Sequence, residues 1–277
     1  AVRKFWERGV LDETANVQFG EGGAGTFSDG KLTTRVHDRL MSEALNTLVE
    51  AGAPPEIRYW YKPHIGTDRL RQVVKNIRQQ IEALGGEVRF GRQVTGLRLG
   101  AGTLTGLILN ETEFLPCSVA LLGIGHSARD SYQTLQRSGV AMEAKPFSVG
   151  VRIEHPQDLI DRAQYGAAAG HPRLGAADYA LVHHDRDTGR TAYSFCMCPG
   201  GVVIGAASEA GGVVVNGMSH YNRASGTANS ALAVNVTPAD FGDGILAGVE
   251  FQRRYEQKAF ELGGRSYFAP VQTVGEF

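Results

Sequence analysis

The chain has 277 residues and nearly balanced charge, with 28 Lys and Arg against 29 Asp and Glu. That balance excludes a module that binds nucleic acid or anionic membranes through a strong positive field. The 42% hydrophobic content and 36 glycines are typical of a soluble, ligand-binding α/β protein. No apolar run could span a bilayer and no signal-peptide core is present, so we expect a cytoplasmic location and neither a membrane nor a nucleic-acid partner. The three cysteines fit neither a disulfide framework nor a usual zinc-ligand spacing.

The first part of the chain predicts a loop followed by two helices. Glycine, Ser and Thr crowd residues 16–35, a composition typical of a loop. Apolar residues at three- and four-residue spacing then predict helices over residues 36–51 and 68–84. Thr67 is the expected N-cap of the second helix.

Strands are predicted along most of the remaining chain. Residues 119–124 form an apolar run that predicts a buried strand, and a short helix is expected after Ala128. A final helix is predicted over residues 244–262. The other predicted strands cover residues 87–90, 94–99, 104–109, 147–153, 179–183, 191–197, 202–206, 213–216 and 231–236. This order indicates α/β architecture with a sheet-rich second half.

Residues Gly20–Gly25 spell Gly-Glu-Gly-Gly-Ala-Gly, which matches the literal pattern G-x-G-x-x-G. A dinucleotide fingerprint also needs a hydrophobic strand before it and an apolar helix after it. Here only Val-Gln-Phe precedes the glycines, and Thr-Phe-Ser-Asp-Gly follows them. The match therefore does not indicate a Rossmann turn.

The same loop carries a family resemblance. Residues 16–32, Asn-Val-Gln-Phe-Gly-Glu-Gly-Gly-Ala-Gly-Thr-Phe-Ser-Asp-Gly-Lys-Leu, resemble the signature loop of a large family of bacterial FAD-dependent dehydrogenases. Further matching segments lie along nearly the whole chain. They are residues 62–68 (KPHIGTD), 125–130 (GHSARD), 195–201 (FCMCPGG), 216–219 (NGMS) and 228–232 (ANSAL).

The resemblance implies a flavoprotein that binds FAD in a Rossmann-like domain interrupted by a substrate or cap domain. The expected fold class is α/β, with an incomplete Rossmann-like FAD-binding domain over residues 1–145 and an inserted sheet-rich (α+β) subdomain over residues 146–277. The family's own G-x-G-x-x-G unit and its second FAD segment are expected outside residues 1–277, so we expect an internal fragment. The predicted activity is hydride transfer between the flavin and an unidentified small molecule, with NAD(P)H or another electron partner.

The glycine loop is the first predicted cofactor site. Glycines let backbone N–H groups approach a flat, anionic cofactor, and hydroxyl and ammonium groups can add donors. We therefore expect added bulk at Gly22 or Gly25 to lower flavin binding before it lowers folding. The alternative is a glycine turn that joins two helices. The predicted FAD-contacting residues of this loop are Gly20, Glu21, Gly22, Gly23, Ala24, Gly25, Thr26, Ser28 and Lys31.

Other candidate cofactor residues follow from the resemblance and from strand ends. The resemblance implies that Val94 approaches the adenine, against the alternative of an ordinary strand valine. Gly123 and Gly125 close the predicted strand 119–124, where ligands of open α/β sheets bind. His126 follows them, either near the flavin or in a structural role.

Some polar residues admit two interpretations. His64 either faces the active site or packs a turn. Cys196 and Cys198 share one strand face and form either a redox dithiol or buried structural thiols. Residues 152–155 contain Arg, Glu and His, either a carboxylate clamp or a surface ion pair. No nucleophile–base pair assigns a catalytic residue. The function is therefore either a flavin oxidoreductase or a non-catalytic ligand-binding or interaction module that no longer binds flavin.

Overall fold

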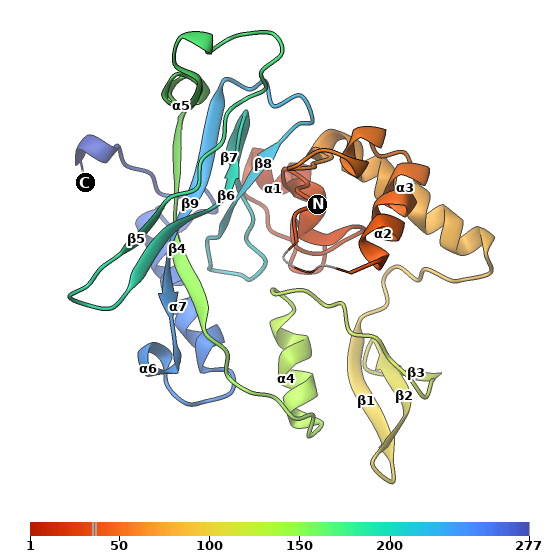
Figure 1. The fold of residues 1–277 in the computed structure, drawn as a ribbon. Helices are drawn as coiled ribbons and strands as arrows, with labels where there is room; N and C mark the ends of the chain where they lie inside the picture. Colours follow the sequence, from red (N-terminus) through yellow and green to blue (C-terminus); the bar gives the residue numbers. More distant parts are fainter. Residues whose placement is uncertain (35, 37, 277) are drawn as a thin grey trace.

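The computed structural model describes residues 1–34, 36 and 38–276. The strands are β1 Val94–Gly100, β2 Thr103–Leu109, β3 Glu113–Pro116, β4 Phe147–Pro156, β5 Val182–His184, β6 Thr191–Cys198, β7 Gly201–Gly205, β8 Val215–Ser219 and β9 Thr227–Val236. They form three sheets, with the orders β1-β2-β3, β4-β9-β6-β5 and β7-β8 (Figure 1). The mixed α/β composition is confirmed. Every strand pairing in the described residues is antiparallel, so the Rossmann-like character of the first half is not confirmed.

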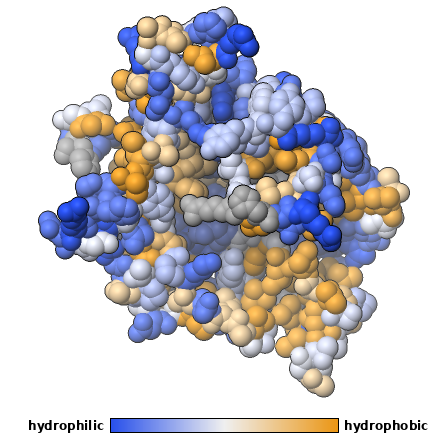
Figure 2. All heavy atoms as spheres, viewed as in Figure 1, coloured by the Kyte–Doolittle hydropathy of each residue, from blue (hydrophilic) through white to orange (hydrophobic). Residues whose placement is uncertain are grey.

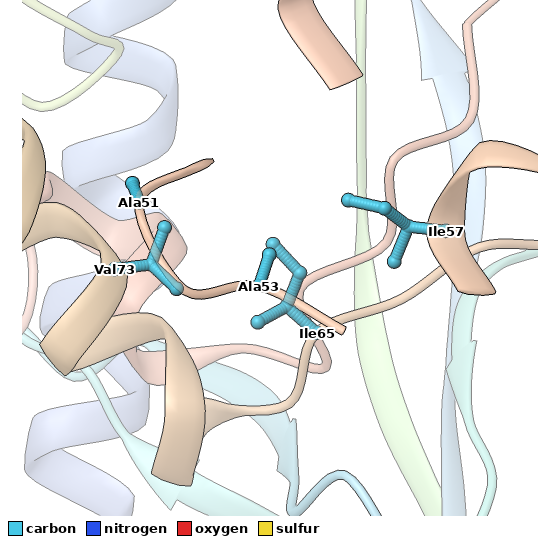
Figure 3. Packing of buried hydrophobic residues seen from close by; sticks show 5 residues of the cluster. All are labelled: Ala51, Ala53, Ile57, Ile65 and Val73. Carbon is cyan, nitrogen blue, oxygen red and sulfur yellow. The ribbon is translucent and has the colours of Figure 1, made fainter. Parts of the chain in front are cut away.

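Helices dominate the first 83 residues. They are α1 Val2–Arg8, η1 Gly23–Phe27, α2 Leu40–Glu50, η2 Pro55–Arg58 and α3 Thr67–Ala83. A buried apolar cluster joins α3 to the segments around α2 and η2, and Figure 3 shows Val73 beside Ala51 and Ile65 beside Ala53. The apolar faces of α2 and α3 pack against this cluster, which confirms the two predicted helices.

The predicted N-cap of α3 was wrong. Gly66 occupies the cap position with a φ of 80°, and Thr67 is the first helical residue. The Thr67 hydroxyl instead donates a hydrogen bond to the Thr26 carbonyl at 2.6 Å. An added Cβ at Gly66 would lie 2.2 Å from the backbone nitrogen of Tyr221, so close approach of two chain segments selects glycine there.

Two predicted strands are not strands in the structure. Residues 87–90 and 119–124 are irregular, and neither pairs with a described strand. An apolar run becomes a buried strand only when neighbouring strands and helices cover it. Val119 is 82% exposed and Leu121 is 99% exposed. Figure 2 shows hydrophobic residues gathered on the lower right of the molecule, over the region of β1, β2 and β3.

The second half contains the larger sheet, which confirms the predicted strand-rich region. β4 and β9 pair along their whole lengths, from Phe147 opposite Val236 to Pro156 opposite Thr227. The pairing is close, since a Cβ at Gly150 would lie 1.8 Å from the Leu232 carbonyl oxygen. The helix α4 Arg129–Arg137 precedes this half, whose own helices are α5 Gln157–Tyr165, η3 Gly166–Ala168, α6 Pro238–Phe241, α7 Ala247–Leu262 and η4 Val274–Glu276.

Contacts join the two halves of the chain. Val17 and the apolar faces of α1 and β7 form a second buried cluster, and the Trp6 indole donates a hydrogen bond to the Gly205 carbonyl at 2.9 Å. Arg129, at the start of α4, forms ion pairs of 2.6 Å with both Glu209 and Glu256. The N-terminal loop is therefore held against the strands of the second half. None of the described helices is long and apolar enough to cross a membrane.

Candidate functional site

All but one of the segments that carry the family resemblance meet in one place. Residues 29–32 run antiparallel to residues 63–66, with backbone hydrogen bonds from Ile65 to Gly30 and from Gly66 to Asp29, both 3.1 Å. The C-terminal end of β6, together with β8 and β9, brings residues 195–201, 216–219 and 228–232 to the same place. We call the polar group at this junction the Asp29 cluster. It consists of Asp29, Lys31, Arg152, Cys196, Cys198, Ser219, Arg223 and Asn229.

The centre of the cluster is the buried carboxylate of Asp29, which is 1% exposed. Arg223 contacts it with Nε at 3.1 Å and Nη2 at 2.6 Å, and the Lys31 ammonium lies 2.6 Å away. The Ser219 hydroxyl donates a further hydrogen bond. Burial opposes ionisation, but the Arg223 hydrogen bond and the charges of Lys31 and Arg223 outweigh it and lower the pKa of Asp29 to about 2. The carboxylate therefore stays ionised and anchors two cations.

Two of the cluster's cations hold the C-terminal end of β6. The Lys31 ammonium donates to the Met197 carbonyl at 2.5 Å, and Arg152 Nη2 donates to the Cys196 carbonyl at 3.0 Å. Gly200 follows with a φ of 51°, and an added Cβ there would lie 1.6 Å from the Arg223 carbonyl oxygen. Glycine is required at this position because the two backbones touch.

The two thiols of the cluster lie within an irregular part of β6. Its pairing with β9 shifts register between Phe195 and Cys198, and Cys196 adopts a φ of 46°. The Cys198 thiol also donates to the Cys196 carbonyl oxygen, at 3.3 Å. A hydrogen bond from Cys198 lowers the pKa of the Cys196 thiol to about 6, and the nearby cations act in the same direction. The same hydrogen bond and burial raise the pKa of Cys198.

Buried polar atoms at and beside the cluster lack partners among the described residues. Asn229 is 0% exposed, and its side-chain oxygen accepts from Arg152 at 2.9 Å while its Nδ2 has no partner. His64 contacts the Tyr221 carbonyl through Nε2 at 2.9 Å, and its Nδ1 is also unpaired. Burial lowers the pKa of His64, whose ring lies close to those of both Trp60 and Tyr221. Unpaired buried groups are costly and commonly mark places where a ligand or water binds.

The predicted glycine loop leads into this cluster. Gly20, Gly22 and Gly25 are exposed, so their backbones face solvent. The hydroxyl hydrogens of Thr26 and Ser28 are already used, because Thr26 donates to the Glu21 carbonyl at 3.2 Å and Ser28 to the Gly25 carbonyl at 2.7 Å. The Ser28 hydroxyl also accepts from the Gly30 N–H at 3.0 Å, and Thr26 is buried, so both side chains chiefly hold the loop closed. The Glu21 carboxylate pairs with Arg78 at 2.5 Å, and Gly23 and Ala24 lie in η1.

Two glycines of the loop have different structural roles. A Cβ at Gly22 would lie 2.2 Å from Thr26 Oγ1 and 3.0 Å from Val74 Cγ2, at a φ of 83°. We expect Gly22→Ala to lower the free energy of unfolding by about 1 to 3 kcal/mol. No heavy atom lies within 4 Å of a Cβ at Gly25. Gly25→Ala should therefore change the free energy of unfolding by less than about 0.5 kcal/mol. Urea unfolding of both variants checks this difference, and equal losses would contradict it. Because Gly22 packs the fold, only Gly25 can report on ligand contact alone.

The other predicted cofactor residues lie apart from this loop. Val94 begins β1 and is partly exposed, and a Cβ at Gly123 or Gly125 would meet no heavy atom within 4 Å. His126 contacts Gln252 of α7 at 3.2 Å, and burial and the Arg129 charge lower its pKa. Among the described hydrogen bonds, ion pairs and ring contacts, none joins these four residues to residues 20–31. Their role in FAD binding stays a prediction.

Polar residues 152–155 separate into different contacts rather than one clamp. Arg152 joins the Asp29 cluster, Glu154 is exposed, and His155 contacts the Tyr179 hydroxyl at 2.9 Å. Neither predicted alternative for these residues matches this arrangement. Alternation along β4 explains it, because Arg152 and His155 lie on opposite faces.

Sequence reasoning missed several members of the cluster: Asp29, Ser219, Arg223 and Asn229. Asp29, Ser219 and Asn229 lie inside the quoted family segments, but their types alone do not distinguish them from turn residues. Asp29 offered one signal, a carboxylate two positions from a lysine inside a glycine-rich loop. Arg223 offered none, because the contact spans 194 positions of sequence.

Comparison with known proteins relates the second half of the chain to FAD-dependent proteins. Residues 146–277 match the family described as FAD-dependent protein, C-terminal domain-like. An uncharacterized protein of Clostridium beijerinckii is 54% identical over 277 residues, which is 100% of this chain and 52% of that protein. The chain spans about half the length of this curated relative. The comparison supports the FAD-dependent family resemblance that the sequence motifs carry.

Proposed function

We propose that the chain is part of an FAD-dependent oxidoreductase, a dehydrogenase acting on an unidentified small molecule with NAD(P)H or another electron partner. When bound, FAD supplies hydride transfer, and the protein supplies orientation and electrostatics. The main observation in support of the proposal is the contact between the glycine loop and the second half of the chain. There the glycine loop meets Met197, Ser219 and Arg223, all within the half that matches the FAD-dependent family.

The residues at this junction fit the ring end of a flavin. Isoalloxazine carbonyls and ring nitrogens accept hydrogen bonds, and Lys31, Arg152 and the unpaired Nδ2 of Asn229 are donors. The exposed backbones of Gly20, Gly22 and Gly25 leave room for a flat cofactor beside them. The pyrophosphate of FAD would need a strand, a glycine turn and a helix in succession. The described residues at this loop do not form that unit.

We propose that residues of a longer protein complete the FAD-binding domain. The curated relative is about twice as long as this chain, and residues 119–122 expose apolar side chains that a sheet strand would normally bury. In this arrangement residues 1–145 form part of a Rossmann-like FAD domain, and residues 146–277 form the substrate or cap subdomain.

Flavin content tests the proposal. We expect the longer natural gene product to carry flavin, measured as visible flavin absorbance per protein, and this chain alone to carry much less. In the longer product, Gly25→Val should lose most of the flavin without lowering the melting temperature. Gly175→Val is a matched control, because a Cβ there also meets no heavy atom within 4 Å.

Two outcomes would contradict this proposal. A longer product that takes up no flavin when FAD is supplied would favour a ligand-binding or interaction module. Full flavin content in Gly25→Val would show that residues 20–25 form only a turn.

A further inference from the structure

The thiols of Cys196 and Cys198 are arranged for redox chemistry. In a regular strand, residues two positions apart lie roughly 6.6 Å apart at Cα, near the upper limit for a disulfide. The register shift after Phe195 and the φ of 46° at Cys196 break that regularity. The Cys198 thiol then donates a hydrogen bond to the Cys196 carbonyl oxygen at 3.3 Å.

The left-handed backbone conformation at Cys196 is strained. Two buried thiols could pack together without this strain. A residue other than glycine in the left-handed region costs about 1 to 2 kcal/mol. Contacts from other elements hold the conformation, since Arg152 binds the Cys196 carbonyl at 3.0 Å and Lys31 binds the Met197 carbonyl at 2.5 Å. Strained backbone held in this way is concentrated at functional sites.

The charged surroundings favour a thiolate at Cys196. Arg152 Nη2 lies 3.8 Å from Cys198 Sγ, and the Lys31 ammonium binds the residue between the two cysteines. Asp29 is the opposing charge, but it is paired with Lys31 and Arg223. A thiol in an electropositive, partly exposed site is the reactive kind. Cys196 is partly exposed, whereas Cys198 is 0% exposed.

We propose that Cys196 and Cys198 form a redox-active dithiol that reduces a small-molecule disulfide, with Cys196 as the attacking and Cys198 as the resolving thiol. The proposal goes beyond the flavin chemistry above and needs no bound cofactor for one turnover. The roles follow from residue exposure, because Cys196 is partly exposed and an incoming disulfide cannot reach the fully buried Cys198 directly.

The reaction balances in two exchanges. The Cys196 thiolate attacks one sulfur of the disulfide, forms a mixed disulfide, and expels the other half as a thiolate. Cys198 gives its proton to that leaving thiolate and attacks Cys196 Sγ. The Sγ–Sγ bond forms, the mixed disulfide breaks, and the second half leaves as a thiolate. The protein loses two electrons, and the small disulfide gains them.

Oxidised glutathione is a suitable probe, used on the full chain in a Cys117→Ser background so that only the pair can react. We expect the intact mass to fall by two hydrogen atoms with no retained glutathione. Cys198→Ser should retain one glutathione on Cys196, and Cys196→Ser should react at least tenfold more slowly. The rate should reach half its maximum near pH 6, well below the value of about 8.5 for an ordinary thiol.

Three results would overturn the proposal. The first is an unchanged mass of the folded Cys117→Ser protein, which needs no further substitution to interpret. The second is glutathione retained on Cys198 in Cys196→Ser at the rate seen without that substitution. The third is a rate that follows an ordinary thiol pKa. None of these results depends on flavin, so they leave the proposed oxidoreductase function separately testable.

Discussion

Replacing Arg129 with methionine is expected to lower the free energy of unfolding by about 3 to 5 kcal/mol. Arg129 is 5% exposed and reaches Glu209 and Glu256 at 2.6 Å and the side-chain oxygen of Gln252 at 3.0 Å. Removing the guanidinium leaves Glu256 without its ion-pair partner, whereas Glu209 keeps its pair with Arg253 at 2.7 Å. Methionine keeps much of the volume, so the loss reports mainly on charge. Urea unfolding monitored by circular dichroism measures it.

Two further variants isolate the cause of this loss. Arg3→Met removes an exposed arginine paired with Glu7 at 3.4 Å, and it should cost at most about 1 kcal/mol. Adding Glu256→Gln to Arg129→Met should recover part of the stability, because one stranded charge disappears. A loss below about 1 kcal/mol in Arg129→Met would show that water replaces the arginine and that α4 is not anchored through it.

Asp29→Asn should cost about 3 kcal/mol or more at neutral pH, because it strands the charges of Lys31 and Arg223. The pH dependence follows from the lowered pKa. Asp29 has a pKa of about 2 when folded, against about 3.9 for an unfolded chain. Its contribution is therefore fully present above pH 4 and is lost as the pH falls towards 2. The contribution is about 2 to 3 kcal/mol.

Stability measured from pH 7 to pH 2 checks this prediction. The wild-type protein should lose more free energy of unfolding between pH 4 and pH 2 than Asp29→Asn does. Asp178→Asn is the matched control, since Asp178 forms a surface pair with Lys62 at 2.7 Å and should change little. Parallel curves for the wild type and Asp29→Asn would refute a special role for the Asp29 carboxylate.

Local patterns were sufficient for the elements whose buried face lies within the described chain. Three- and four-residue spacing predicted α2 and α3, since both bury that face on the cluster around Ile57 and Ile65. The runs that became β4, β6, β7 and β9 were likewise predicted, because β-branched and small residues suit closely paired strands. Residues 119–124 carry an equally apolar pattern and form no strand, because no described strand pairs with them.

The candidate site was likewise predicted only in part from the sequence. The sequence by itself determined which segments matter, because the glycine loop, the Phe-Cys-Met-Cys-Pro-Gly-Gly turn and the Asn-Gly-Met-Ser strand carry the resemblance in their residue types and order alone. Only the tertiary structure decided that they meet around Asp29, with Arg223 beside it and the Cys198 thiol bonded to the Cys196 carbonyl. The physical reason is that ion pairs and thiol contacts are set by distances in space. Residue spacing specifies a helix face or a strand face, but not which two faces lie within hydrogen-bonding distance.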